Sequence, residues 1–109
     1  MTIKVAVVGA LGKMGKEVIK AVVQSNDFEL VCAIDKFELG FNVCEDVAIE
    51  GDILKAFELR KPDVAVDFTQ PDTVFENIKT YLDLNVKSVI GTTGLSDKQL
   101  DEIKSLSAE

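Results

Sequence analysis

Hydrophobic residues along the chain follow two alternating patterns. Short, continuous apolar runs rich in β-branched residues are typical of strands buried on both faces of a parallel sheet. Stretches with apolar residues three or four positions apart are typical of amphipathic helices. The runs predict strands at residues 3–8, 30–34, 64–68 and 88–90, with a shorter strand near 47–49 inside a loop-like segment. The periodic stretches predict helices at residues 13–25, 53–60, 73–84 and along 100–106.

Residues at the ends of the predicted helices support these boundaries. Asp52 can cap the second helix, and Pro71 suits the first turn of the third. Asn26 and Asn85 stand where a left-handed residue often ends a helix, and residues 96–99 have the form of a capping box. The apolar positions predicted to face the core are Met14, Val18, Ala21 and Val22 on the first helix, and Val74, Ile78 and Leu82 on the third.

Strands that alternate with helices predict an α/β fold, specifically a Rossmann-like doubly wound parallel sheet. Right-handed crossovers place the principal strands in the spatial order second, first, third, fourth. The order then reverses between the strands that end at Val8 and Phe68, and ligands of such sheets bind in the crevice at that reversal. We expect one domain spanning 1–109, which stops after the fourth principal strand and its helix.

Composition narrows the function classes. The chain has 109 residues and a formal net charge of −7, which makes it a poor candidate for nucleic-acid binding. It contains no histidine, which excludes Ser-His-Asp and Cys-His catalysis and imidazole-based zinc sites. Cys32 and Cys44 are too few for a disulfide framework or a metal site. No apolar stretch approaches the ~20 residues that cross a bilayer, so we expect a cytoplasmic protein with no membrane partner.

The most informative motif follows the first predicted strand. Gly9, Gly12 and Gly15 open the first helix with a spacing close to that of the dinucleotide fingerprint. The helix N-terminus supplies amide groups and partial positive charge for a pyrophosphate. Asp35 ends the second strand, where an acid can accept the ribose hydroxyls, and Lys36 could pair with a 2′-phosphate. Both NAD and NADP therefore remain open, as does an ordinary tight turn with a solvated carboxylate.

Two further strand ends reach the same edge of the predicted sheet. The segment 67–69 reads Asp-Phe-Thr, and the segment 91–94 reads Gly-Thr-Thr-Gly. Glycines allow close backbone approach, and threonine hydroxyls can bind a carboxamide or a ribose. Either segment alone would be read as an ordinary loop. Their convergence with the glycine turn on one crevice favours dinucleotide binding.

In these motifs the sequence resembles the N-terminal domain of the dihydrodipicolinate reductase family. The likeness rests on Val8 to Gly15, on residues 67–69 and on residues 91–94, in order, and it spans nearly the whole chain. The resemblance implies a bacterial NAD(P)-dependent oxidoreductase of lysine and diaminopimelate biosynthesis, using NADH or NADPH. The cofactor-binding residues that it implies are Gly9, Ala10, Leu11, Gly12, Lys13, Met14, Asp35, Lys36, Phe68, Thr69, Gly91, Thr92 and Thr93.

The resemblance also implies what this chain lacks. Family members continue into a substrate domain with a histidine-rich segment that holds and protonates the substrate. In the full-length protein, a homo-oligomer, hydride passes from the coenzyme to 4-hydroxy-tetrahydrodipicolinate. We therefore expect a fragment that binds coenzyme without catalysis, and no residue of it is nominated as a catalytic acid. Two alternatives stay open: a non-catalytic NAD(H)-sensing module, and the nucleotide domain of another amino-acid-pathway dehydrogenase.

Overall fold

The strands and helices predicted between residues 3 and 90 are all present. The computed structural model describes residues 2–44 and 46–91, so the helix predicted along 100–106 lies outside the described residues. The ends of the elements differ from the predictions by at most two residues. In chain order the elements are β1 (Ile3–Val8), α1 (Lys13–Gln24), β2 (Phe28–Ile34), β3 (Asn42–Cys44), β4 (Val47–Glu50), α2 (Ile53–Arg60), β5 (Val64–Asp67), α3 (Pro71–Asp83) and β6 (Lys87–Ile90).

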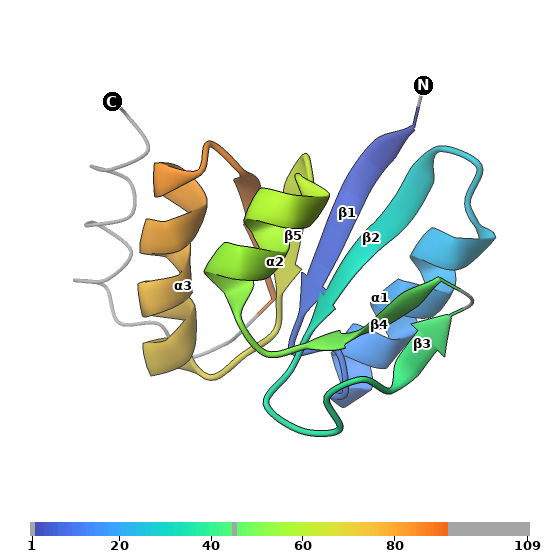
Figure 1. Ribbon diagram of the computed structural model, residues 1–109, viewed down its shortest axis with the longest axis horizontal. Coiled ribbons are helices and arrows are strands. Elements are labelled where there is room, and N and C mark those ends of the chain that lie inside the picture. Colours follow the sequence, from blue (N-terminus) through green and yellow to red (C-terminus); the bar gives the residue numbers. More distant parts are fainter. Residues whose placement is uncertain (1, 45, 92–109) are drawn as a thin grey trace.

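The strands form one six-stranded sheet in the order β3-β4-β2-β1-β5-β6. All neighbouring strands are parallel except β3, which pairs antiparallel with β4. The predicted order of the principal strands is confirmed as β2-β1-β5-β6. β1 lies between β2 and β5 (Figure 1). The strand order therefore reverses between β1 and β5, as predicted.

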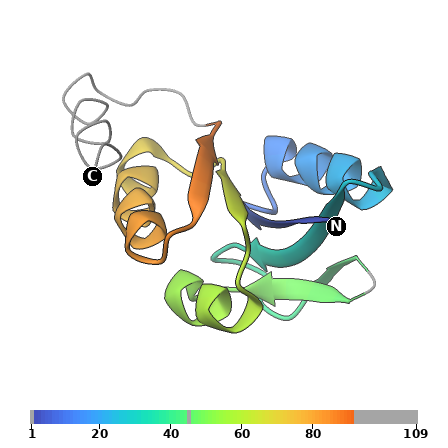
Figure 2. The same ribbon diagram turned by 90° about the horizontal axis from the view of Figure 1, so that it is seen from above.

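Helices cover both faces of the sheet. α1 packs on one face, and α2 and α3 pack on the other (Figures 1 and 2). β1 contributes to the core on both faces of the sheet, because successive side chains of a strand point to opposite faces. Val5 and Val7 pack on the α1 side, whereas Ala6 and Val8 pack on the side of α2 and α3. The architecture is a Rossmann-like α/β fold with an open sheet.

Three expectations require correction. α1 ends at Ser25 in an extended conformation, and Asn26 is not among the described residues with positive φ, whereas Asn85 is. The buried face of α1 consists of Gly15, Ile19 and Val22, whereas Met14 and Ala21, also predicted to face the core, are exposed. β3 was not predicted at all, because its three residues form a short strand that depends on pairing with β4.

Candidate functional site

A cleft of about 460 Å³ opens where β1, β2 and β5 end. Its position matches the rule that ligands of open α/β sheets bind beyond the carboxyl ends of the strands at the reversal of strand order. Further walls come from the start of α2 and from α3, through Ile53, Thr73 and Asn77. The residues predicted to bind cofactor that line this cleft are Gly9, Gly12, Asp35, Lys36, Phe68 and Thr69.

The three glycines of the turn differ in what the structure requires of them. Gly9 has φ +83°, a left-handed conformation that favours glycine. A Cβ on Gly15 would lie 2.2 Å from the Gly9 carbonyl oxygen, so only glycine lets α1 pack this closely on the turn. A Cβ on Gly12 would meet only that same oxygen, at 3.4 Å, which is ordinary van der Waals contact. Gly12 therefore leaves open space that the fold itself does not require.

The amides of the turn fall into two groups. The N–H groups of Gly9 and Ala10 both donate to the Ile34 carbonyl, at 2.8 and 3.0 Å, and that of Gly12 donates to Gly9 at 3.2 Å. The helical ladder begins with Lys16 N–H donating to the Gly12 carbonyl at 2.9 Å. The three amides of residues 13–15 therefore have no acceptor within α1. Gly12, the N-cap, offers no side chain to them, and the first turn contains no acidic residue.

Asp35 ties the glycine turn to the segment after β2. Its Oδ2 accepts a hydrogen bond from Leu11 N–H at 3.0 Å, and its Oδ1 accepts one from Lys36 N–H at 2.7 Å. Phe37 N–H also donates to Oδ1, at 3.4 Å. Each carboxylate oxygen can accept two hydrogen bonds, so Oδ2 can still receive a further donor from the cleft. Lys36 is exposed at the cleft, and it forms no ion pair within the described part of the chain.

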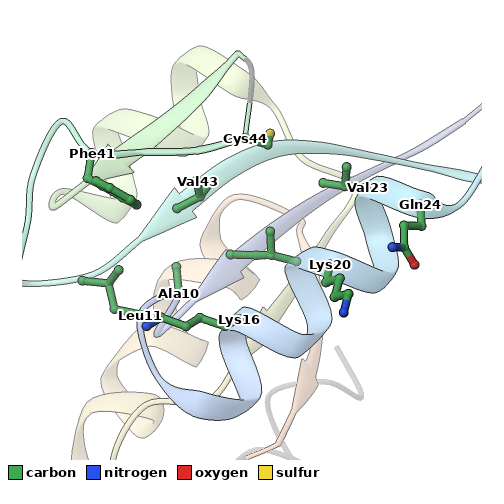
Figure 3. Close-up of a pocket in the computed structure, with 10 residues that line it drawn as sticks. Ala10, Leu11, Lys16, Lys20, Val23, Gln24, Phe41, Val43 and Cys44 are labelled. Atoms are coloured by element: carbon green, nitrogen blue, oxygen red, sulfur yellow. The ribbon is translucent and has the colours of Figure 1, made fainter.

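Ala10 and Leu11 face away from this cleft. They border a second groove of about 380 Å³, between α1 and the β3 strand, together with Lys16, Phe41 and Val43 (Figure 3). The side chain of Ala10 is fully buried, and the Leu11 amide is already bonded to Asp35. Lys13 and Met14 are exposed at the start of α1 and do not belong to the described lining of either hollow.

The end of β6 packs against the segment that follows β5. A Cβ on Gly91 would clash with the ring of Phe68, so only glycine lets this ring lie so close to β6. Gly91 N–H donates to the Asp67 carbonyl at 2.8 Å, which holds the two strand ends together. Thr92 and Thr93, also predicted to bind cofactor, lie outside the described residues.

Sequence reasoning missed the polar residues that α3 contributes. Asn77 lines the cleft and donates from Nδ2 to Asp67 Oδ2 at 3.0 Å. Tyr81, one helical turn further, donates from its hydroxyl to the same oxygen at 2.6 Å. The available signal was the i, i+4 spacing of two polar side chains beside the apolar stripe of this helix.

Within residues 2–44 and 46–91, no three His, Cys, Asp or Glu side chains gather so as to hold a metal ion. No helix in the described part of the chain is long and apolar enough to span a bilayer.

Comparison with known proteins agrees with the geometry. A family model described as dihydrodipicolinate reductase, N-terminus, matches residues 3–109. A protein from Syntrophomonas wolfei named 4-hydroxy-tetrahydrodipicolinate reductase is 41% identical over 97% of this chain and 42% of its own length. One of the same name from Listeria innocua is 41% identical over 94% of this chain and 42% of its own length. The chain thus spans less than half the length of these relatives.

Solved structures give the same result. A dipicolinate-bound dihydrodipicolinate reductase from Paenisporosarcina sp. TG-14 superposes with a TM-score of 0.87 at 36% identity, covering 98% of this chain and 43% of its own. A homoserine dehydrogenase from S. aureus superposes with a TM-score of 0.80 at 16% identity, covering 99% of this chain and 30% of its own. At that identity the second likeness shows the fold alone.

Proposed function

Because the chain belongs to the dihydrodipicolinate reductase family, matching its N-terminal model over residues 3–109, we propose that it is the coenzyme-binding domain of a 4-hydroxy-tetrahydrodipicolinate reductase. Such an enzyme reduces 4-hydroxy-tetrahydrodipicolinate in lysine and diaminopimelate biosynthesis, a cytoplasmic pathway. NADH or NADPH, when bound, supplies the hydride.

The observation that carries this proposal is the uncapped start of α1 beside the cleft. Helix N-termini bind phosphates through unpaired amides and the positive end of the helix dipole. α2 has the side chain of Asp52 as its cap and α3 has Asp72 in its first turn, whereas α1 has neither kind of group. The pyrophosphate is assigned to the amides of Lys13 and Met14, with Gly12 leaving the space for its approach.

The adenosine ribose is assigned to the end of β2. Asp35 is held by three backbone amides, which fixes its carboxylate at the cleft with room for a ribose hydroxyl. Lys36 stands at the same rim and offers its ammonium group to a 2′-phosphate. The pair suits NADH through the acid and NADPH through the base, so comparable affinity for the two coenzymes is expected.

Reduction of the substrate is assigned to the longer protein, with the part of the relatives that this chain does not cover. Coenzyme binding without reduction is the activity proposed for the 109-residue chain. Substrate binding and assembly into a homo-oligomer are proposed for the longer protein.

Titration calorimetry with NADH and NADPH tests the proposal. The unmodified chain is expected to bind both, and Gly12→Val is expected to bind neither measurably. The variant should fold, because a Cβ at Gly12 meets only one atom at 3.4 Å, but its methyl groups occupy the space for phosphate. Ala21→Val is the matched control, because it adds a β-branched residue to an exposed position of the same helix. Failure of the unmodified chain to bind either coenzyme rejects the proposed function, and normal binding by a folded Gly12→Val rejects the phosphate assignment.

A further inference from the structure

Asp67 is the one fully buried charged side chain among the described residues, with 0% exposure. It ends β5, directly below the cleft. Burying an ionised carboxylate costs free energy unless hydrogen bonds or an opposite charge replace its hydration. In the described part of the chain no lysine or arginine forms an ion pair with it. Hydrogen bonds must therefore compensate for the buried charge.

The two oxygens of Asp67 bond to different parts of the fold. Oδ1 accepts from Thr69 twice, from the backbone N–H at 2.8 Å and from Oγ1 at 2.5 Å. Oδ2 accepts from Asn77 Nδ2 at 3.0 Å and from the Tyr81 hydroxyl at 2.6 Å, both on α3. Each of these groups can donate, which is what a carboxylate needs. One side chain thus joins the segment after β5 to the helix that follows it.

The segment that Asp67 bonds is part of the cleft wall. Phe68, Thr69 and Asn77 all line the cleft, and residues 68–70 belong to no helix or strand. Phe68 N–H donates to the Val8 carbonyl at 2.9 Å, and the Gln70 carbonyl accepts from Val74 N–H at 2.8 Å, so the two ends of the segment are fixed to β1 and to α3. The bonds of Asp67 to Thr69 hold its middle residue.

Tyr81 anchors the network on the core side. Its ring is fully buried and stacks on Phe57, with centroids 5.6 Å apart. Burial raises the pKa of the Tyr81 hydroxyl above its ordinary value, and the neighbouring negative charge of Asp67 raises it further. The hydroxyl therefore stays protonated as a donor at physiological pH.

We infer that Asp67 is a positioning residue, whose buried carboxylate holds Thr69 and Asn77 so that residues 68–70 form the wall against which the coenzyme binds. This inference rests on the proposed function for its effect on affinity. Its structural part, the fixing of residues 68–70, stands without any ligand.

Asp67→Leu in the full chain, with Tyr81→Phe as the matched control, tests the inference. Leucine keeps the branched shape of the carboxylate but has no acceptor atom, so it removes the bonds to Oδ1 as well as those to Oδ2. Tyr81→Phe removes one bond to Oδ2 and leaves both Thr69 bonds to Oδ1 in place. Both variants lose a buried bond, but only the first removes the bonds that join Thr69 to residue 67.

The first measurement is amide hydrogen exchange without coenzyme. Asp67→Leu should speed exchange at Thr69 by about tenfold or more, whereas Tyr81→Phe should leave it near that of the unmodified chain. The second is calorimetry with NADH, in which Asp67→Leu should weaken affinity about tenfold if the binding conformation falls to about a tenth of the population. Tyr81→Phe should keep normal affinity even where its melting temperature is lower.

The outcomes separate the inference from the proposed function. Unchanged Thr69 exchange in Asp67→Leu overturns the inference, and so does faster exchange with unchanged NADH affinity. If the unmodified chain binds neither NADH nor NADPH, the proposed function fails, and the exchange data alone decide whether Asp67 fixes the segment. Should Asp67→Leu not fold, exchange in the unmodified chain decides, because the inference requires Thr69 N–H to exchange more slowly than the Met14 N–H, which has no acceptor within α1.

Discussion

Cys32 and Cys44 illustrate how surroundings set the chemistry of one residue type. Cys32 is fully buried in β2, and its Sγ lies 3.9 Å from Glu50 Oε2. The pKa of its thiol is raised from 9.0 to about 12, mainly by burial and also by the negative charge of Glu50, while the positive charge of Arg60 acts in the opposite direction. Cys44 is a free thiol and only half-buried. In this position Cys32 acts as a small apolar residue of the core.

The thiols should therefore differ in reactivity. At about pH 8 an alkylating reagent is expected to label Cys44 in the folded chain and Cys32 only after unfolding, because the thiolate is the reactive form. Mass spectrometry of labelled peptides with and without urea checks this. Labelling of Cys32 at the same rate in both conditions would contradict its burial.

The same shift has a consequence for stability. The folded pKa of Cys32 lies above its unfolded value, so the unfolded chain loses this proton first as the pH rises. The contribution is complete below pH 9.0 and is lost as the pH rises toward about 12. Tyr81 acts in the same direction above its ordinary value of 10.0. Both effects make the free energy of unfolding fall at alkaline pH.

At the scale of elements, α1 has no side-chain cap, which lowers the stability of the helix and leaves its first amides without a side-chain acceptor. Its N-cap Gly12 has φ −71° and ψ 165°, the extended conformation in which an aspartate can cap a helix. Gly12→Asp should therefore raise the free energy of unfolding by about 0.5 kcal/mol, through a new cap and a favourable charge at the helix dipole. The same carboxylate would occupy the proposed phosphate site and repel the coenzyme.

The expected result is a more stable variant without coenzyme affinity. Urea denaturation measures the stability, and calorimetry with NADH measures the binding. Lys16→Asp, one turn further along α1, also adds negative charge but lies outside the cleft lining. Gly12→Asp that binds NADH as well as the unmodified chain would show that α1 does not bind the phosphate.

Most element boundaries could be predicted because local residues specify them. α2 has the predicted bounds, since Asp52 caps it with a bond to Lys55 N–H at 3.2 Å and Pro62 follows it. The face of α1 could not be predicted from hydrophobicity alone. Gly15 must lie on the turn at Gly9, and this contact orients the helix so that Ile19 is buried and Val18 only partly buried.

The site was predictable to the extent that it is built from strand ends. Gly9, Asp35 and Phe68 meet at one cleft because their strands are parallel neighbours, which periodicity and crossover handedness predict. The inward polar network was not predictable in this way. The bonds from Asn77 and Tyr81 to Asp67 span 10 and 14 residues, and only the packing of α3 on the sheet brings these groups together.

At the scale of the whole molecule, an acidic chain is proposed to bind an anion. The net charge of −7 repels a dinucleotide at long range, so the attraction must come from short-range contacts at the start of α1. Ligand that binds only the folded state stabilises it by about 2.7 kcal/mol at a hundredfold excess over the dissociation constant. For a domain of this size that corresponds to a rise in melting temperature of about 10 °C or more.

The dependence of this rise on salt distinguishes the two electrostatic contributions. Repulsion between separated surface charges is screened beyond about 10 Å at 0.1 M salt, whereas contacts in a partly buried cleft are screened much less. The rise in melting temperature with NADH should therefore persist or increase as sodium chloride is added. Differential scanning calorimetry at several salt concentrations measures it, with Gly12→Val as the control that shows no rise at any of them. A rise that shrinks steadily with salt would instead mean that exposed lysines attract the coenzyme, and it would place the anion away from the amides of α1.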